Sequence, residues 1–332
     1  MNGNEENKMS HYKAPPAEMK ELTRGVYAFL QAPGTAVSNA GLIVGKRDAM
    51  VVDSLDNKYM VENFISKIKE VTDKPIHLVV NTHVHPDHTH TNHYFPEAKV
   101  ITSHINRKEM VHYTPERVER LTRIYPGQIC HEGSKITLQD MTFEGTLCLY
   151  DGEREIRIID MGVGHSQSDV IVYLPQEKVL FAGDLLAVGM QPRGVEKIWG
   201  GSYRIIKVLD TLASMDVETF VPGHGMLVLS REETASMIYE FIEFYMVLRG
   251  EAHNCFEKGM TYDEAFEKLD WSKFKKWGKK EELKVVRGNL ARAFSEFRGE
   301  PLGIKIDFQR RGDEVTLLRP GANSGDTDLQ KA

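Results

Sequence analysis

Short apolar runs alternate with amphipathic stretches along most of the chain, a pattern that is typical of α/β proteins. Apolar runs between residues 25 and 53, separated by Pro33-Gly34 and by Gly45, predict two or three β-strands. In the stretch that follows, apolar residues recur every three or four positions. This spacing predicts a helix with one apolar face, formed by Val61, Phe64, Ile65, Ile68 and Val71. The run 76–80 then predicts a strand of the buried type.

The later part of the chain predicts further strands and then mostly helices. A helical stretch around 104–125 contains Pro115 where a second helix would begin. Strands are predicted at 141–150, 155–160, 170–174, 178–182 and 218–221. Apolar stripes with helical spacing are formed by Ile205, Val208, Leu209, Leu212 and Met215, by Ile238, Tyr239, Ile242, Tyr245 and Met246, and by Val286, Leu290, Ala293, Phe294 and Phe297. We therefore expect a polar N-terminal tail at 1–20, an α/β domain at 21–230, a helical C-terminal segment at 231–310 and a polar tail at 311–332.

The composition is that of an ordinary globular protein. Of the 332 residues, 41% are hydrophobic and 27% are charged, which excludes wholesale disorder and allows a sizeable core. The net charge of −6 argues against nucleic acid or an anionic membrane as a partner. The apolar runs are far shorter than the ~18 residues that span a bilayer, and the polar N-terminus predicts no secretory signal. Three widely separated cysteines are typical of a reducing compartment, so we expect a cytoplasmic protein.

Basic residues gather near the C-terminus. Residues 271–300 contain nine Lys or Arg against four Asp or Glu. Such a segment is either a solvated helix face, which we favour, or a collar that attracts an anionic substrate. The C-terminal helices, which include Trp271, Phe274 and Trp277, are expected to close a pocket or to form a homodimer contact.

Histidines are concentrated in one short segment. Five of the 13 histidines lie within residues 83–93. The pattern H-x-H-x-D-H in this segment is formed by His83, His85, Asp87 and His88. In a loop after a strand, this spacing lets neighbouring side chains converge, and Pro86 restricts the backbone. Imidazole and carboxylate groups are ligands suited to Zn²⁺, and also to Mn²⁺ or Fe²⁺. His90 and His93 follow the pattern and are expected at the surface or behind the ligands.

Three more candidate ligands lie elsewhere in the chain. His165, Asp184 and His224 each follow an apolar strand run and a glycine. The glycine lets the backbone turn sharply or pack closely. Because α/β folds usually bind ligands at strand ends, we expect these side chains and the histidine segment to form one metal site at the edge of a sheet.

These segments resemble the signature segments of the metallo-β-lactamase superfamily. THVHPDH, GVGHSQSD, FAGDLL and FVPGHG follow one another within roughly 25–230, and VVDSL at Asp53 resembles the acidic residue that ends an early strand of that family. The resemblance implies an αββα sandwich with a dinuclear metal site at its edge. It also implies a small-molecule substrate and two Zn²⁺ per chain, with Fe or Mn as alternatives.

The resemblance assigns a role to each candidate ligand. One metal would be held by His83, His85 and His165. The other would be held by Asp87, His88 and His224, with Asp184 as the bridge. Asp87 would also orient the nucleophile, a water molecule whose pKa two shared cations lower to about 7. Supporting positions are expected for Asp53, Thr82 and Asn92, and Asn92 is equally well interpreted as a helix cap.

Departures from known branches of the family narrow the expected reaction. Flavin-linked diiron members replace the second histidine with glutamate, whereas this chain has His85, which favours hydrolysis over redox chemistry. True β-lactamases usually carry cysteine or serine at the position of Asp184, which disfavours β-lactam hydrolysis. Asp184 resembles the bridging residue of thioesterase, lactonase and glyoxalase II members. We therefore expect hydrolysis of an ester, thioester, lactone or related bond.

Two interpretations from other classes stay open. A mononuclear-iron persulfide dioxygenase would use a similar ligand set, and metal analysis with oxygen uptake distinguishes it from a hydrolase. A non-catalytic metal-binding module is the weaker alternative, because no ligand of the set is missing.

Substrate specificity is expected to come from less regular segments. The loop 31–39 is expected to overhang the metals. The expected pocket residues, which are equally well interpreted as simple packing, are Met190, Arg193, Trp199 and Tyr203. They offer apolar and aromatic walls with one cation, which suits an aromatic or acyl substrate.

Overall fold

The computed structural model describes residues 13–34, 36–112, 130–188, 202–278, 285–299, 304–306 and 315–317. The chain divides into two compact units. The first comprises 1–162, 168–190 and 209–239, and the second comprises 163–167, 191–208 and 240–332. The domain boundary expected after residue 230 stays a prediction.

Seven strands form the first sheet, and they follow one another from β1 to β7. Neighbouring strands run antiparallel from β1 to β4 and parallel from β4 to β7. The parallel strands therefore end at one edge, and the histidine segment follows β5 there. The strands are Ala17–Thr23 (β1), Val26–Gln31 (β2), Ala40–Val44 (β3), Ala49–Val52 (β4), Ile76–Val80 (β5), Lys99–Ser103 (β6) and Met141–Phe143 (β7).

Six strands form the second sheet, in the order β13-β12-β11-β10-β9-β8. Only β11 and β12 pair in parallel within this sheet. The strands are Thr146–Asp151 (β8), Arg154–Asp160 (β9), Val170–Leu174 (β10), Val179–Phe181 (β11), Thr219–Val221 (β12) and Leu229–Ser230 (β13).

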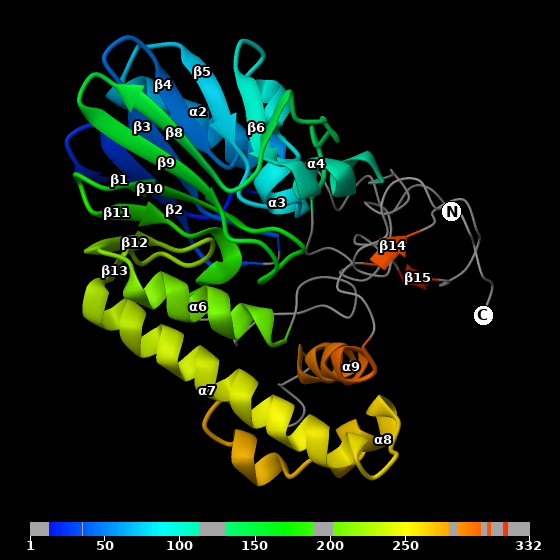
Figure 1. The fold of residues 1–332 in the computed structure, drawn as a ribbon. Helices are drawn as coiled ribbons and strands as arrows, with labels where there is room; N and C mark the ends of the chain where they lie inside the picture. The colour runs from blue at the N-terminus through cyan, green and yellow to red at the C-terminus, as the bar shows by residue number, and fades with distance from the viewer. Residues whose placement is uncertain are drawn as a thin grey trace. The chain divides into compact units, whose positions relative to one another are not determined.

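Apolar side chains from the inner faces of both sheets share one buried core. Val80 of the first sheet and Phe181 and Val221 of the second belong to it. On its other face, the first sheet packs against the apolar side of α2 (Lys58–Val71), which includes Phe64. Figure 1 shows the two sheets face to face, with α2 against the first and α6 (Arg204–Ser214) beside β12 and β13. This arrangement confirms the expected αββα sandwich.

Helices connect the strands of the sandwich, and further helices follow it. In the described ranges, no helix is both long enough and apolar enough to cross a membrane. The helix α7 (Arg231–Phe256) begins in the first unit and continues in the second. The others are α3 (Pro86–Thr89), η1 (Asn92–Tyr94), α4 (His104–Val111), η2 (Gly183–Leu185), α8 (Tyr262–Lys268), η3 (Trp271–Phe274) and α9 (Val285–Phe297), and β14 (Ile304–Ile306) pairs with β15 (Val315–Leu317).

The second unit has an aromatic cluster of its own. The ring of Phe244 lies 6.0 Å from that of Phe274 and 5.3 Å from that of Trp277, centroid to centroid. Trp271 lies 5.7 Å from Phe274. The three aromatic residues expected to close a pocket or form a dimer contact therefore pack on one another in this unit.

The structure corrects the predicted elements at three places. Residues 17–20, expected in the N-terminal tail, belong to the edge strand β1, which pairs with β2. The single strand predicted at 141–150 is two strands in different sheets, because Gly145 turns the chain with a φ of +69°. Residues 315–317, expected in the C-terminal tail, form β15. The helix predicted to begin near Pro115 lies outside the described residues.

Phe64 tests the packing of α2 on the first sheet. Its side chain is fully buried, and its ring centroid lies 4.8 Å from that of Phe29. Phe64→Ala should lower the free energy of unfolding by about 3–5 kcal/mol, measured by urea denaturation, because it leaves a cavity. Tyr150→Ala, at a side chain that is 70% exposed, should change it by no more than about 0.5 kcal/mol. Equal losses in both variants would contradict this packing.

Candidate metal centre

One segment after β5 supplies four of the candidate ligands. In the turn between β5 and α3 lie His83 and His85, and in α3 itself lie Asp87 and His88. Pro86 occupies the first turn of α3, where its missing N–H costs nothing. The turn and the short helix thus place four side chains at the edge of the first sheet.

Three other loops supply the remaining candidates. His165 lies between β9 and β10, Asp184 lies in η2 after β11, and His224 follows β12. The glycines before the last two residues allow close packing. A Cβ atom at Gly223 would lie 2.2 Å from Asp184 Oδ1, and one at Gly183 would lie 2.8 Å from the side chain of Thr82. The loops can therefore approach one another only with glycine at these positions.

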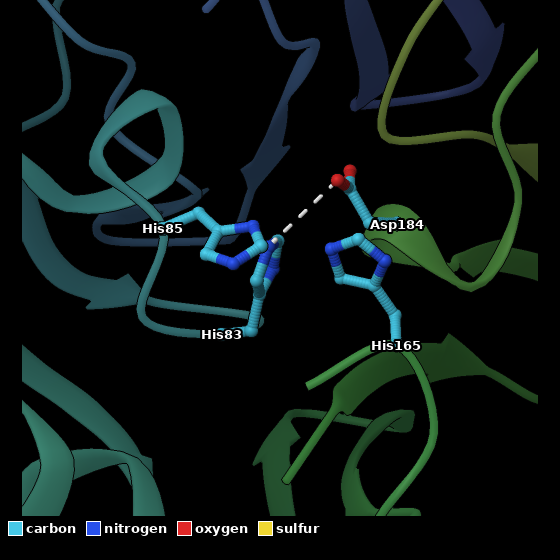
Figure 2. A group of neighbouring side chains, drawn as sticks. All are labelled: His83, His85, His165 and Asp184. Atoms are coloured by element: carbon cyan, nitrogen blue, oxygen red, sulfur yellow. Dashed lines mark ion pairs between the residues drawn. The ribbon is translucent and has the colours of Figure 1, made fainter. Parts of the chain in front are cut away.

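A first group of donors combines three imidazoles and one carboxylate. Its members are His83, His85, His165 and Asp184, and one ligand atom of each lies within 4.8 Å of the others. Figure 2 shows these side chains gathered around one point. His83 Nε2 lies 3.8 Å from Asp184 Oδ2. Nitrogen and carboxylate oxygen are donors that zinc binds in proteins, so the group fits a divalent cation.

A second group lies next to the first. It consists of Asp87, His88 and His224, whose ligand atoms also lie within 4.8 Å of one another. His224 Nε2 lies 3.6 Å from Asp87 Oδ2, and His88 Nε2 lies 3.9 Å from the same oxygen. Asp184 Oδ1 lies 3.2 Å from His88 Nε2 and 3.1 Å from His224 Nε2. The structure therefore brings all seven predicted side chains together, with Asp184 in contact with both groups.

The Asp53 carboxylate orients two of the imidazoles. It accepts hydrogen bonds from the Thr82 amide and hydroxyl, both at 2.8 Å, and from His88 Nδ1 at 2.7 Å. Because His88 donates from Nδ1, its Nε2 atom is directed into the second group. Because the Thr82 hydroxyl donates its hydrogen bond to Asp53, it accepts one from His83 Nδ1 at 3.1 Å, which leaves His83 Nε2 for the first group. Asp53 and Thr82 thus hydrogen-bond to two of the candidate ligands, and a supporting role for them in metal binding stays a prediction.

Burial and charge act in opposite directions on the histidines of the second group. Burial lowers the pKa of His88, but the carboxylates of Asp53, Asp184 and Asp87 outweigh it and raise the pKa well above its ordinary value. Burial also lowers the pKa of His224, and Asp184 and Asp87 reverse that effect, so this pKa is raised as well. The carboxylates therefore favour positive charge on the two imidazoles. A bound divalent cation would supply this charge and displace the imidazole protons.

Polar residues that no motif marks hold these loops in place. The Ser38 hydroxyl donates to the backbone carbonyl of Asp87. The Asn39 amide donates to two backbone carbonyls that flank His224, at 2.9 and 2.8 Å. The Val37 carbonyl lies 2.6 Å from His224 Nδ1 and accepts its proton, which directs the Nε2 atom into the site. Residues 37–39 thus contact the second group, at Asp87 and around His224, through backbone and short polar side chains.

Asn92 acts through a second asparagine. Its side-chain amide donates to Asn81 Oδ1 at 2.9 Å and accepts from Asn81 Nδ2 at 3.0 Å. Asn81 Nδ2 also donates to the His88 carbonyl at 3.0 Å. The residue that caps η1 is Thr91, so the interpretation of Asn92 as a helix cap is wrong. Asn92 instead supports the ligand segment from behind.

A third group of potential donors, Asp56, His90 and His131, lies outside this centre. His90 is fully buried and its Nδ1 atom lies 3.1 Å from Asp56 Oδ1. Neither Asp56 nor His131 belongs to a recognisable motif. The closeness of these residues could not be read from the sequence, because His131 lies 41 residues after His90.

The expected substrate pocket falls largely outside the described residues. Met190, Arg193 and Trp199 lie in the part of the chain that the structure does not describe. Tyr203 is 51% exposed, and its ring lies 5.5 Å from the Arg249 guanidinium. A role for these four side chains in substrate binding stays a prediction.

Comparison with known proteins places this geometry in a family. The sequence model of the Metallo-beta-lactamase superfamily matches residues 33–224, more than half of the chain. The chain therefore belongs to the metallo-β-lactamase superfamily, and the resemblance of its motifs is confirmed. Its sandwich is a hydrolase fold that carries candidate metal-binding clusters.

Individual relatives are distant. The chain is 20% identical over 260 residues to a linear primary-alkylsulfatase from Pseudomonas sp. (strain ATCC 19151), which covers 69% of this chain and about half (49%) of that relative. The sec-alkylsulfatase Pisa1 from Pseudomonas sp. matches with a TM-score of 0.64 and 17% identity, over 85% of this chain and 50% of that one. A metallo-beta-lactamase from Pontibacter korlensis matches with a TM-score of 0.54 and 20% identity, over 68% of this chain and 99% of that one. At these identities the solved structures show the fold alone.

Asp53→Asn tests the support of the ligand segment. An asparagine amide can donate to His88 Nδ1, which would move the imidazole proton to Nε2 and block that atom as a ligand. We expect the affinity for Zn²⁺ to fall by about 10- to 100-fold, measured by competition with a chromophoric chelator. The control is Asp73→Asn, at an exposed position, which should bind zinc as the wild type does. An unchanged affinity in Asp53→Asn would contradict the orienting role.

Proposed function

We propose that the protein is a dinuclear metallo-hydrolase that cleaves an ester, thioester, lactone or related bond of a small molecule. The position of Asp184 carries this proposal. One of its carboxylate oxygens lies 3.8 Å from His83, and the other lies within 3.2 Å of His88 and His224. A carboxylate that reaches both donor groups is suited to bridge two cations. Membership of a superfamily with a hydrolase fold supports the same conclusion.

The residues present fit zinc, and also iron or manganese, in both groups. The first cation would be held by His83, His85 and His165, and the second by Asp87, His88 and His224. When bound, such a pair of cations would lower the pKa of a bound water molecule toward neutral and would polarise the substrate oxygen.

The protein side chains contribute position and environment to this chemistry. The Asp87 side chain is 12% exposed, whereas that of His88 is fully buried. A partly accessible carboxylate can accept a hydrogen bond from the attacking water and so orient it. The burial of Asp184 and His88 keeps bulk water away, which strengthens each electrostatic interaction in the site.

Sulfate ester hydrolysis is a second candidate reaction. The match to the sec-alkylsulfatase covers 85% of this chain, whereas the match to the Pontibacter korlensis metallo-beta-lactamase covers 68%. The likeness to the alkylsulfatase therefore extends beyond the length that a metallo-beta-lactamase occupies. The primary-alkylsulfatase relative supports the same substrate class.

A substrate panel with metal analysis decides among these reactions. Purified enzyme would be tested on lactones, thioesters, aryl esters, β-lactams and primary and secondary alkyl sulfates, with product and sulfate release measured. Two zinc ions per chain with acyl hydrolysis would support the proposal, and dominant sulfate release would favour the second candidate. One iron per chain with oxygen uptake on a persulfide would overturn both in favour of a persulfide dioxygenase. Folded protein with metal but no turnover on any substrate would favour a metal-binding module.

Asp184→Asn should lower metal content and turnover together. The neutral amide removes a negative charge that both groups of donors contact, so we expect kcat to fall on the order of 100-fold or more. Elemental analysis and steady-state kinetics provide the two readouts. Asp210→Asn, at an exposed position on α6, is the matched control and should behave as wild type. Full activity with an unchanged metal count in Asp184→Asn would refute the dinuclear site.

His165→Ala and His224→Ala test whether loops distant in sequence complete the site. Each substitution removes one imidazole from a different group, so each should reduce kcat/KM by orders of magnitude while the fold persists. Far-UV circular dichroism and kinetics on the best panel substrate are the measurements. Wild-type rates in both variants would show that the ligand assignment is wrong.

A further inference from the structure

The group formed by Asp56, His90 and His131 lies behind the segment that carries the candidate metal centre. Asp56 lies in the loop between β4 and α2, and His90 ends the short helix α3. Neither residue belongs to the two donor groups described above. All three residues belong to the first compact unit.

The distances within this group match the spacing of metal ligands. Asp56 Oδ1 lies 3.1 Å from His90 Nδ1, and Asp56 Oδ2 lies 3.5 Å from His131 Nδ1. One ligand atom of each residue lies within 4.8 Å of the others. A tetrahedral zinc ion with bonds of about 2.0–2.1 Å spaces its ligand atoms by about 3.3 Å. Two imidazoles and one carboxylate leave one position for water in that geometry.

Burial makes this arrangement costly without a cation. The side chains of Asp56 and His90 are each 1% exposed, and that of His131 is 15% exposed. Within the described ranges, Asp56 Oδ2, His90 Nε2 and both ring nitrogens of His131 lack a hydrogen-bond partner. Buried polar atoms normally have hydrogen-bond partners, so this concentration of buried atoms without a hydrogen bond calls for a ligand.

Hydrogen bonds between the three side chains do not explain why they lie together. Charge-assisted hydrogen bonds between imidazolium and carboxylate are about 2.7–2.9 Å long, whereas His131 Nδ1 lies 3.5 Å from Asp56 Oδ2. The rings of His90 and His131 meet edge to face with centroids 6.1 Å apart, so they do not stack either. The nearby Lys58 is paired with Glu132 and does not neutralise the Asp56 carboxylate.

We propose that Asp56, His90 and His131 bind a divalent cation of the zinc type at a site separate from the candidate metal centre. This cation would be structural. The surrounding backbone is already joined at the same place, because the Ser134 hydroxyl donates to the Asp56 carbonyl at 2.5 Å and the Lys135 amide donates to the His90 carbonyl at 2.9 Å. A cation there would fasten residues 131–135 and the loop before α2 to the end of α3, two residues beyond His88.

The test counts zinc ions bound by metal-free protein after equilibrium dialysis and elemental analysis. His131→Gln should bind one equivalent fewer than wild type, while Asp56→Asn reproduces the loss from the opposite side of the site. His77→Gln, at a histidine whose side chain is 54% exposed, is the matched control and should bind as wild type does. Folded His131→Gln and Asp56→Asn proteins that bind the wild-type number of ions would overturn the proposal.

A variant with an altered candidate metal centre tests the separate site independently of the proposed catalytic function. The double variant Asp184→Asn, His224→Ala alters both groups of the candidate metal centre, yet it should keep one zinc ion that depends on His131. Zinc should also raise the melting temperature of this double variant, and the rise should vanish when His131→Gln is added. If the zinc count and melting temperature of the double variant are the same with and without His131→Gln, the separate site does not exist, whatever the catalytic assays show.

Discussion

Buried negative charge is the constraint on which this structure depends. Asp53, Asp87 and Asp184 lie together with five imidazoles at the edge of the sandwich, and among these imidazoles His83 and His88 are fully buried whereas His85 is half-buried. Burying ionised carboxylates is costly unless opposite charge pairs with them. The raised pKa values of His88 and His224 show that these side chains would take up protons to meet that demand. A divalent cation bound by these side chains would supply the positive charge in their place.

The sandwich brings these charged side chains together because several of its strands end at one edge. The parallel strands of the first sheet direct the segment after β5 toward this edge, and the parallel pair β11 and β12 directs the loops with Asp184 and His224. Asp53 then holds the histidines from behind, and Asn39 fastens the loop of His224 to the first sheet. The positions of the candidate ligand side chains therefore depend on the hydrogen bonds that hold their backbone and rings in place.

The sequence predicted those elements and candidate ligands whose pattern is visible within a few neighbouring residues. The apolar face of α2 and the H-x-H-x-D-H segment are visible within a few residues; α2 forms as a helix, and the segment's side chains lie among the two donor groups. The strand β1 was missed because its sequence AEMKELT alternates at a solvent-exposed edge and lacks an apolar run. The break between β7 and β8 depends on one glycine, Gly145, inside an otherwise strand-like stretch. Asn39 escaped notice because its partners lie more than 180 residues away, where only the folded chain brings them near.

Anomalous diffraction at the zinc edge, from crystals grown with zinc, locates any bound zinc among these side chains. We predict one peak among His83, His85 and His165 and a second among Asp87, His88 and His224, with the Asp184 carboxylate between them. Zinc peaks confined to surface side chains, with these seven residues hydrogen-bonded to one another and to water, would contradict the account.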